Sequence, residues 1–192
     1  MQNKISAHFS EHARILERVA DSLGGKIADC AVLLKAALQR GNKILVMGNG
    51  GSAADAQHFA AELVGRFLLE RRALPAIALT TDSSILTAVG NDYGFDEVFR
   101  RQVEALAVAG DVVIGISTSG NSENVYRALQ AANQAGCQTV ALLGRDGGRI
   151  AASVDLALTV PAQQTPYIQE AHVTIIHLLC DLVEQELFGL DG

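Results

Sequence analysis

From Lys43 onward, short apolar runs alternate with longer segments that have helical spacing. The runs are KILVMG, PAIALT, DVVIGIS, QTVALLG and LALTVP, and most are β-branched and bounded by Gly, Pro, Asp or Asn. Continuous apolar runs of this length are typical of strands covered on both faces. Because alternating strands and helices require crossover connections, the pattern predicts an α/β fold with a doubly wound, parallel, five-stranded sheet.

Helical patterns surround and separate these runs. Two helices are expected before the sheet, over residues 4–23 and 26–39, and a long C-terminal helix over residues 167–188. Segments 53–69, 83–108 and 123–135 are long enough for the helices between strands. No linker or repeat divides the chain, so we expect one domain over residues 1–192. Residues 1–40 would be a helical extension that packs on the core or on a partner subunit.

Composition excludes several classes of protein. Hydrophobic residues make up 49% and charged residues 19%, which is typical of a compact protein, and the net charge of −6 leaves no broad basic face for nucleic acid. No apolar run approaches the ~20 residues of a membrane span, and the N-terminus lacks the apolar block of a signal peptide. The odd, scattered cysteines (Cys30, Cys137, Cys180) indicate buried free thiols. We therefore expect a cytoplasmic protein with no membrane or nucleic-acid partner.

A glycine-rich loop, Gly48-Asn49-Gly50-Gly51-Ser52, joins the first predicted strand to a helix. Its Gly-x-Gly-x-x-Ala pattern raises the possibility of a dinucleotide site, which needs an acidic residue about 20 positions further on. The first candidate after a second strand, Asp82, lies well beyond that distance. No nucleotide cofactor is expected.

A second loop, within GISTSGNSENV, has four hydroxyl side chains (Ser117, Thr118, Ser119, Ser122) between a predicted strand and a helix. Hydroxyls and backbone N–H groups at a helix N-terminus bind dianions. No lysine is present, so the loop is not a P-loop. The alternative is a plain helix cap, which needs only one hydroxyl. We interpret the loop as a phosphate site.

Candidate acids and bases lie on two helices. His58 and Glu62 are four residues apart and share a helix face, although such a pair is more often a solvated hydrogen-bonded couple. The C-terminal helix contains Gln169, His172 and His177. Gln169 and His177 are about 12 Å apart along a helix axis. A sugar-phosphate isomerase needs an acid and a base at one carbon pair, which these helices can supply.

Two further groups have ordinary explanations as well as functional ones. Asn91 and Asp92 are expected in a turn after the second strand, at the same sheet edge as the loops, where turn chemistry alone accounts for them equally well. Arg66, Arg71 and Arg72 are interpreted as surface charge.

Several blocks together resemble a sugar-isomerase (SIS) domain and, more closely, the phosphoheptose isomerase family. The blocks are GNGGSAADAQHFAAELVGRF, GNDYG, GDVVIGISTSGNSENV, LLGRDGG and IQEAHVTIIH, and the similarity runs over nearly the whole chain. The resemblance implies conversion of D-sedoheptulose 7-phosphate to D-glycero-D-manno-heptose 7-phosphate, the first step of lipopolysaccharide heptose biosynthesis. It also implies a cytoplasmic homotetramer with active sites at subunit interfaces.

The resemblance assigns roles to residues of this sequence. Glu62 and His177 match the catalytic acid–base pair. The substrate-binding positions that match are Asn49, Gly50, Gly51, Glu62, Asn91, Asp92, Ser117, Thr118, Ser119, Ser122 and Gln169. The positions proposed to bind zinc in some members match His58, Glu62, Gln169 and His177. The spacing of Gln169 and His177 makes one shared zinc difficult unless long side chains or different subunits supply the ligands.

One departure and two alternatives accompany the resemblance. Relatives often have an arginine just before Gln169, whereas this chain has Pro166 and Tyr167, so the distal end of the substrate would be held differently. The main alternative is a non-catalytic SIS-domain tetramer of the DiaA type, which binds the replication initiator DnaA and has no need of both Glu62 and His177. The other is a SIS enzyme acting on an amino-sugar phosphate, although such enzymes usually have additional domains.

Overall fold

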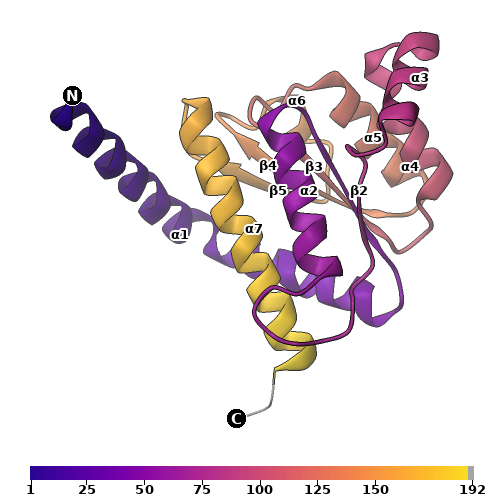
Figure 1. Cartoon of the computed structure of the whole chain (residues 1–192), viewed down its shortest axis with the longest axis horizontal. Helices are drawn as coiled ribbons and strands as arrows, with labels where there is room; N and C mark the ends of the chain where they lie inside the picture. Colours follow the sequence, from indigo (N-terminus) through magenta and orange to yellow (C-terminus); the bar gives the residue numbers. More distant parts are fainter. Residues whose placement is uncertain (190–192) are drawn as a thin grey trace.

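A single parallel sheet forms the centre of the computed structural model, which describes residues 1–189 (Figure 1). Its strands are β1 (Ile44–Gly48), β2 (Ala76–Ala78), β3 (Val112–Ser117), β4 (Gln138–Gly144) and β5 (Leu156–Val160). They pair in parallel in the order β2-β1-β3-β4-β5. All five predicted strands and the doubly wound α/β class are confirmed.

Helices cover both faces of this sheet. They are α1 (Gln2–Gln39), α2 (Gly51–Val64), α3 (Ser83–Tyr93), α4 (Arg100–Leu106), α5 (Glu123–Gln134), α6 (Gly148–Ala151) and α7 (Thr165–Phe188), with a 3-10 turn η1 (Phe95–Glu97). Helices α1, α2 and α7 enclose one buried apolar cluster, and α4, α5 and α6 border the other. Alternate residues of the strands point to each cluster, as in β1, where Ile44 and Val46 face the first and Leu45 and Met47 the second.

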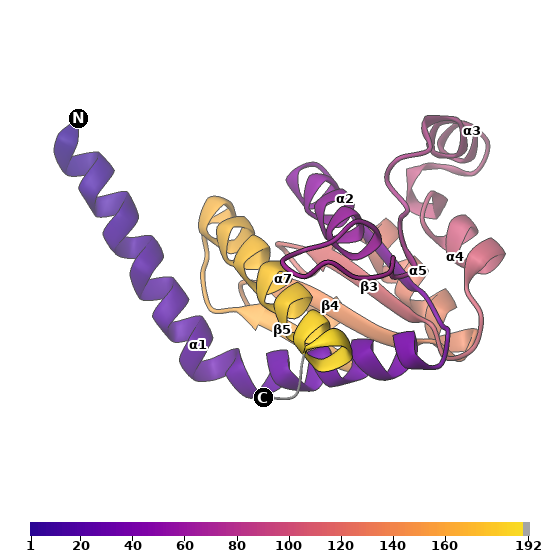
Figure 2. The ribbon, with the colours of Figure 1, turned by 60° about the horizontal axis from the view of Figure 1, so that its bottom comes forward.

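The prediction of two N-terminal helices is wrong, because residues 2–39 form one continuous helix. Leu23 and Ile27 are four residues apart and both buried, so the apolar stripe continues through Gly24 and Gly25. Glycine weakens a helix but does not end it when packing continues on both sides. Figure 2 shows that α1 changes direction along its length, and paired small residues are a common cause of such bends.

The segment 83–108, expected to be helical, divides into α3, η1 and α4. Gly94 follows α3 with a φ of 92°, a backbone conformation that glycine adopts readily and that ends the helix. Asn91 and Asp92 therefore lie in the last turn of α3, and their predicted position in a turn is wrong.

The strand order places a topological switch point between β1 and β3, since β2 continues the sheet on one side and β4 on the other. In open α/β sheets, ligands bind beyond the carboxyl ends of the strands at this point. The glycine loop follows β1 and the hydroxyl loop follows β3, so the fold places both loops at the expected binding edge.

Two smaller expectations concern the cysteines and membrane segments. Cys30, Cys137 and Cys180 are buried free thiols, as predicted. Burial raises the pKa of Cys30 and of Cys180 to about 12, so both remain protonated. Among residues 1–189, no helix combines the length and the apolar character that crossing a membrane requires.

Candidate active site

A cavity of about 320 Å³ opens where the glycine loop, the hydroxyl loop and the first turns of α7 meet. All but one of the residues that line it are polar or glycine, and we call it the polar cavity. It is lined by Asn49, Gly50, Gly51, Ser52, Ile116, Ser117, Thr118, Ser122, Thr165 and Gln169. Ser52, Ile116 and Thr165 were not predicted. Their positions beside predicted loop or helix residues were the only available signal.

The hydroxyl loop is not a plain helix cap. Ser122 is the N-cap residue of α5, yet its side chain makes no capping hydrogen bond. Its Oγ lies 2.9 Å from the Oγ of Ser117, at the wall of the cavity. Both hydroxyls are therefore oriented toward the cavity beside the N-terminus of α5, where backbone N–H groups favour an anion.

Ser119 differs from the other three hydroxyl residues, because it does not line the polar cavity. Its Oγ accepts a hydrogen bond from the Asn121 N–H at 3.2 Å. The neighbouring Gly120, at φ +67°, packs so closely on the loop before α6 that an added Cβ would lie 2.0 Å from the Gly147 carbonyl oxygen. Ser119 thus supports the turn that presents Ser117, Thr118 and Ser122.

Asn49 connects the two loops. Its amide makes two reciprocal hydrogen bonds of 2.9 Å with the amide of Asn124, which is buried at the start of α5. Asn124 also accepts a hydrogen bond from the Val125 N–H. This amide pair fixes the distance between the glycine loop and the hydroxyl loop, and hence the width of the cavity.

Gln169 closes the cavity from α7. Its side-chain amide packs on Gly51 so closely that an added Cβ there would lie 2.3 Å from the Gln169 Nε2. Glycine at position 51 therefore creates the space in which Gln169 faces the polar cavity.

Of the predicted acid–base pair, His177 lines a different hollow of the same chain, and Glu62 lines neither that hollow nor the polar cavity. A depression of about 240 Å³, which we call the histidine hollow, is lined by Phe67, Thr174, His177, Leu178 and Asp181. The Nε2 atoms of His58 and His177 are 2.8 Å apart, and His58 Nδ1 is 3.6 Å from Glu62 Oε1. One imidazole donates and the other accepts, so one hydrogen lies between the two Nε2 atoms.

Helix geometry separates this hollow from the polar cavity. Glu62 follows Gly51 by about 16 Å along α2, and His177 follows Gln169 by about 12 Å along α7. Within one chain, the structure brings His58, Glu62 and His177 together and brings the two loops and Gln169 together. It does not bring these two groups to one point.

Asn91 and Asp92 lie outside both cavities. They are exposed on α3, where the Asn91 amide donates to the Asp92 carboxylate at 2.9 Å. A substrate bound in the polar cavity of the same chain would therefore not contact Asn91 or Asp92, so the predicted contact is not made within one chain.

The four residues that resemble a zinc site do not fit one metal ion in this chain. Gln169 is held against Gly51, about two turns of α7 from His177. In residues 1–189, no group of three or more His, Cys, Asp or Glu side chains is arranged to hold a metal. The Nε2 atoms of His58 and His177 are 2.8 Å apart, which is a hydrogen-bond distance and is shorter than the separation of about 3.3 Å that two tetrahedral zinc ligands need.

Asp55, which was not among the predicted site residues, lies one turn before His58 on α2. Burial raises the pKa of its carboxyl, an effect that the neighbouring His58 partly offsets, and its Oδ2 is buried without a hydrogen-bond partner. Asp55 and His58 are three residues apart, a spacing that places two side chains on the same face of a helix and that is visible in the sequence.

The interpretation of all three arginines as surface charge is wrong for Arg71. Its side chain is 1% exposed and forms an ion pair with the fully buried Glu184 at 2.8 Å. Arg66 fits the prediction, with a side chain that is 58% exposed. Arg72 is also exposed.

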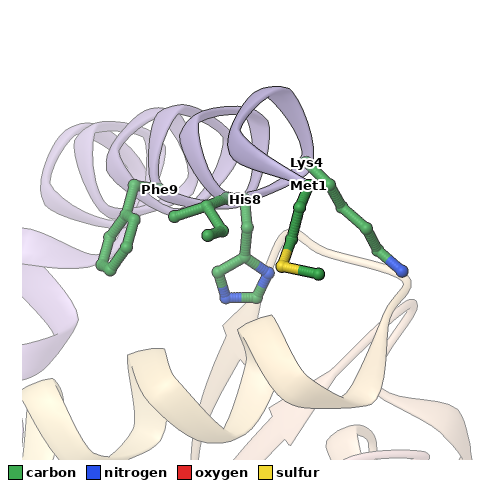
Figure 3. A pocket seen from close by; sticks show the side chains of 5 residues that line it. Met1, Lys4, His8 and Phe9 are labelled. Atoms are coloured by element: carbon green, nitrogen blue, oxygen red, sulfur yellow. The ribbon is translucent and has the colours of Figure 1, made fainter.

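A third hollow, of about 340 Å³, lies at the N-terminal end of α1 (Figure 3). Met1, Lys4, Ile5, His8 and Phe9 line it, and Phe9 is 67% exposed. Figures 1 and 2 show this part of α1 extending beyond the body of the sheet. The hollow is apolar and carries none of the predicted site residues.

Comparison with known proteins identifies the family. A SIS domain model matches residues 7–144. The phosphoheptose isomerase of Geobacter sulfurreducens is 65% identical over 188 residues, which cover 98% of this chain and 100% of that protein. The phosphoheptose isomerase of Geotalea uraniireducens is 62% identical over 189 residues, with 98% and 100% coverage.

Solved structures agree with these relatives. A phosphoheptose isomerase from Neisseria gonorrhoeae superposes with a TM-score of 0.92 at 50% identity, covering 96% of this chain and 98% of that one. One from Francisella tularensis gives a TM-score of 0.93 at 40% identity with the same coverage. The fold, the two loops and the relatives lead to one conclusion: the chain belongs to the phosphoheptose isomerase family of SIS-domain proteins.

Proposed function

We propose that this protein isomerises D-sedoheptulose 7-phosphate to D-glycero-D-manno-heptose 7-phosphate, the first step of lipopolysaccharide heptose biosynthesis, in the cytoplasm. The polar cavity carries this proposal, because the Ser117 and Ser122 hydroxyls, which are bonded to each other and make no helix cap, line it at a helix N-terminus, where a sugar phosphate would bind. The relatives named above are isomerases, which favours this function over the DnaA-binding alternative.

The reaction requires one carbon-bound proton and one oxygen-bound proton to move. The Glu62 carboxylate removes a proton from C1 of the ketose while His177 protonates O2, which gives an enediol. Glu62 then returns the proton to C2 as His177 accepts the proton of O1, which leaves the aldose. An acid and a base at this carbon pair suffice, and no hydride or electron leaves the sugar.

The active site is proposed to form between subunits of a homotetramer. Glu62 and His177 lie roughly 12–16 Å along their helices from the cavity of their own chain. A neighbouring copy would place its own pair beside this cavity, and the same packing would bring Asn91 and Asp92 to the substrate. The exposed Ile5 and Phe9 of α1 support association, since an apolar face of this kind is typical of a subunit contact (Figure 3).

A direct assay tests this function. Purified protein incubated with sedoheptulose 7-phosphate should form the heptose 7-phosphate, detected by chromatography and mass-balanced against the loss of ketose. A soluble, folded protein that forms no product but binds DnaA would favour the adaptor alternative. Turnover of an amino-sugar phosphate alone would favour the other SIS activity.

We predict that Ser122→Ala raises the KM for the sugar phosphate about 10- to 100-fold, because one hydrogen bond to a charged group contributes about 1.5–3 kcal/mol. The kcat should change little, since the phosphate is held equally in the ground and transition states. Steady-state kinetics measures both values. Ser153→Ala, which alters a hydroxyl bonded only to the Ile150 carbonyl, is the matched control. An unchanged KM for Ser122→Ala would contradict the phosphate site.

Zinc binding is proposed on the family resemblance alone, because residues 1–189 of one chain hold no metal-binding group, and no catalytic step depends on it. We therefore expect protein dialysed against EDTA to retain its kcat. Metal analysis before and after dialysis measures occupancy, and assays in chelated buffer measure turnover. Loss of activity that added Zn²⁺ restores would contradict a metal-free proton transfer.

A further inference from the structure

The carboxylate of Glu184 is buried in α7 and accepts an unusually complete set of hydrogen bonds. Three consecutive backbone N–H groups of the segment after α2 donate to it, from Phe67 at 2.7 Å, Leu68 at 2.8 Å and Leu69 at 2.9 Å. The Arg71 Nε donates as the fourth, at 2.8 Å. The segment is therefore fastened to α7 by one side chain that is 0% exposed.

Arg71 fastens the same segment to the end of α2. Its guanidinium donates to the carbonyl oxygens of Glu62 and Leu63, both at 2.8 Å. These belong to the last turn of α2, where helix carbonyls lack partners within the helix. Arg71 thus satisfies the backbone of Glu62, the residue assigned as base.

The other end of the segment reaches the histidine. The Phe67 ring stacks on the His177 ring, with centroids 5.5 Å apart and an interplanar angle of 29°. Because Glu184 accepts the Phe67 N–H, the same carboxylate that anchors Arg71 sets the position of this ring.

We infer that Arg71 and Glu184 are positioning residues for the catalytic pair, holding Glu62 through its carbonyl and His177 through the stacked ring of Phe67. This role rests on the proposed isomerase function. The Arg71 and Glu184 side chains are 1% and 0% exposed, whereas that of Glu62 is 23% exposed, so neither Arg71 nor Glu184 acts on the substrate directly. Their effect would be on the placement of two groups that must both reach one carbon pair.

The ionisation of Glu184 agrees with this geometry. Burial alone would raise the pKa of its carboxyl, but the N–H groups of Leu69, Phe67 and Leu68 and the Arg71 guanidinium outweigh burial and lower the pKa below its usual value. Glu184 is therefore charged at neutral pH, and its contacts with the segment persist throughout the range in which the enzyme would work.

Arg71→Lys tests the role, because an ammonium can pair with Glu184 but cannot also reach two carbonyls as a planar fork does. We expect kcat to fall about 10- to 100-fold, since small misplacements of catalytic groups have effects of this size, while KM stays within about threefold. Phe67→Leu, which keeps the buried ion pair and removes the stacked ring, should also lower kcat, with little change in Tm.

Asp111→Asn is the matched control. Asp111 is another fully buried carboxylate, paired with Lys43 and accepting the Val108 N–H, but it precedes β3 at the opposite edge of the sheet. It should lower Tm comparably and leave kcat unchanged.

The outcomes separate the two proposals. A fall in kcat at constant KM for Arg71→Lys and Phe67→Leu, absent in Asp111→Asn, supports the positioning role. If the kcat and KM of both variants match those of Asp111→Asn, the positioning role is overturned. The proposed isomerase function is unaffected by that result. If Arg71→Lys does not fold, Phe67→Leu decides. A wild-type protein without isomerase activity overturns the proposed function and the positioning role with it.

Discussion

Glu62→Gln is expected to lower kcat by about 10²–10⁴-fold, the range that removal of a general base usually gives. The amide has nearly the same shape as the carboxylate but cannot accept a proton from carbon. The Glu62 side chain is 23% exposed at the face of α2 that carries His58, and among residues 1–189 no cation pairs with it apart from His58 when protonated. The substitution should therefore change the chemistry with little effect on folding.

The same variant should retain its KM, because the phosphate is held in the polar cavity by residues from other segments. Kinetics at saturating substrate, with circular dichroism and the Tm as checks of folding, separate chemistry from binding. Glu70→Gln is a suitable control, since its side chain is 91% exposed and pairs only with Arg66. Normal turnover by Glu62→Gln would show that another group removes the proton.

Mixing of two impaired variants, assayed at a substrate concentration well below the KM of Ser122→Ala, tests whether the site lies between subunits. If a cavity uses the Glu62 of a neighbouring copy, mixed tetramers of Glu62→Gln and Ser122→Ala contain some sites with both residues intact. Activity should then exceed that of either parent after subunits are exchanged. If the mixture has only the average activity of its two parents after verified subunit exchange, the complete site lies within one chain.

The sequence predicts the sheet and its binding edge well, for a local reason. Each strand is a continuous apolar run, and the loops that follow β1 and β3 carry their chemistry in adjacent residues, as in Asn49 to Gly51 and Ser117 to Ser122. Parallel strands bring such loops to the same edge. Little beyond local pattern was required to place the polar cavity.

The sequence fails where the answer depends on a distant partner. Arg71 appears in a charged cluster, and only its pairing with Glu184, on a helix near the other end of the chain, explains why it is buried. Asn91 and Asp92 have turn chemistry, yet the helix continues to Tyr93 because Gly94 is the residue with positive φ. Glu62 and His177 lie away from the polar cavity of their own chain, and a site between subunits, as proposed above, would depend on other copies of the chain, which no local pattern encodes.

His172 provides the second large prediction, because it is a fully buried histidine that the proposed mechanism does not use. It is 0% exposed, and its Nε2 lies 2.9 Å from the Leu143 carbonyl oxygen, so this nitrogen carries the hydrogen. The Nδ1 is buried without a hydrogen-bond partner. Burial lowers the pKa of His172 from 6.5 to about 4, an effect that its hydrogen bond to Leu143 only partly offsets.

The sign of the pH dependence follows from these values. Between pH 6.5 and about 4, the unfolded chain binds a proton at His172 that the folded chain does not, so the free energy of unfolding falls as pH decreases. The contribution is fully present above pH 6.5, and about 3 kcal/mol is lost by pH 4. Other groups that titrate in this range add their own contributions, so a variant is needed to isolate this one.

His172→Gln keeps an N–H donor for the Leu143 carbonyl but has no group that titrates. Its urea-unfolding free energy should decline less than that of the wild type between pH 7 and pH 4, by about 3 kcal/mol. All curves require one protein concentration, because association also stabilises the folded state. His8→Gln is the control, since this side chain is 44% exposed and should gain little from the exchange. If His172→Gln and the wild type decline in parallel, His172 is protonated in the folded protein, and a buried water or a local opening must then serve its Nδ1.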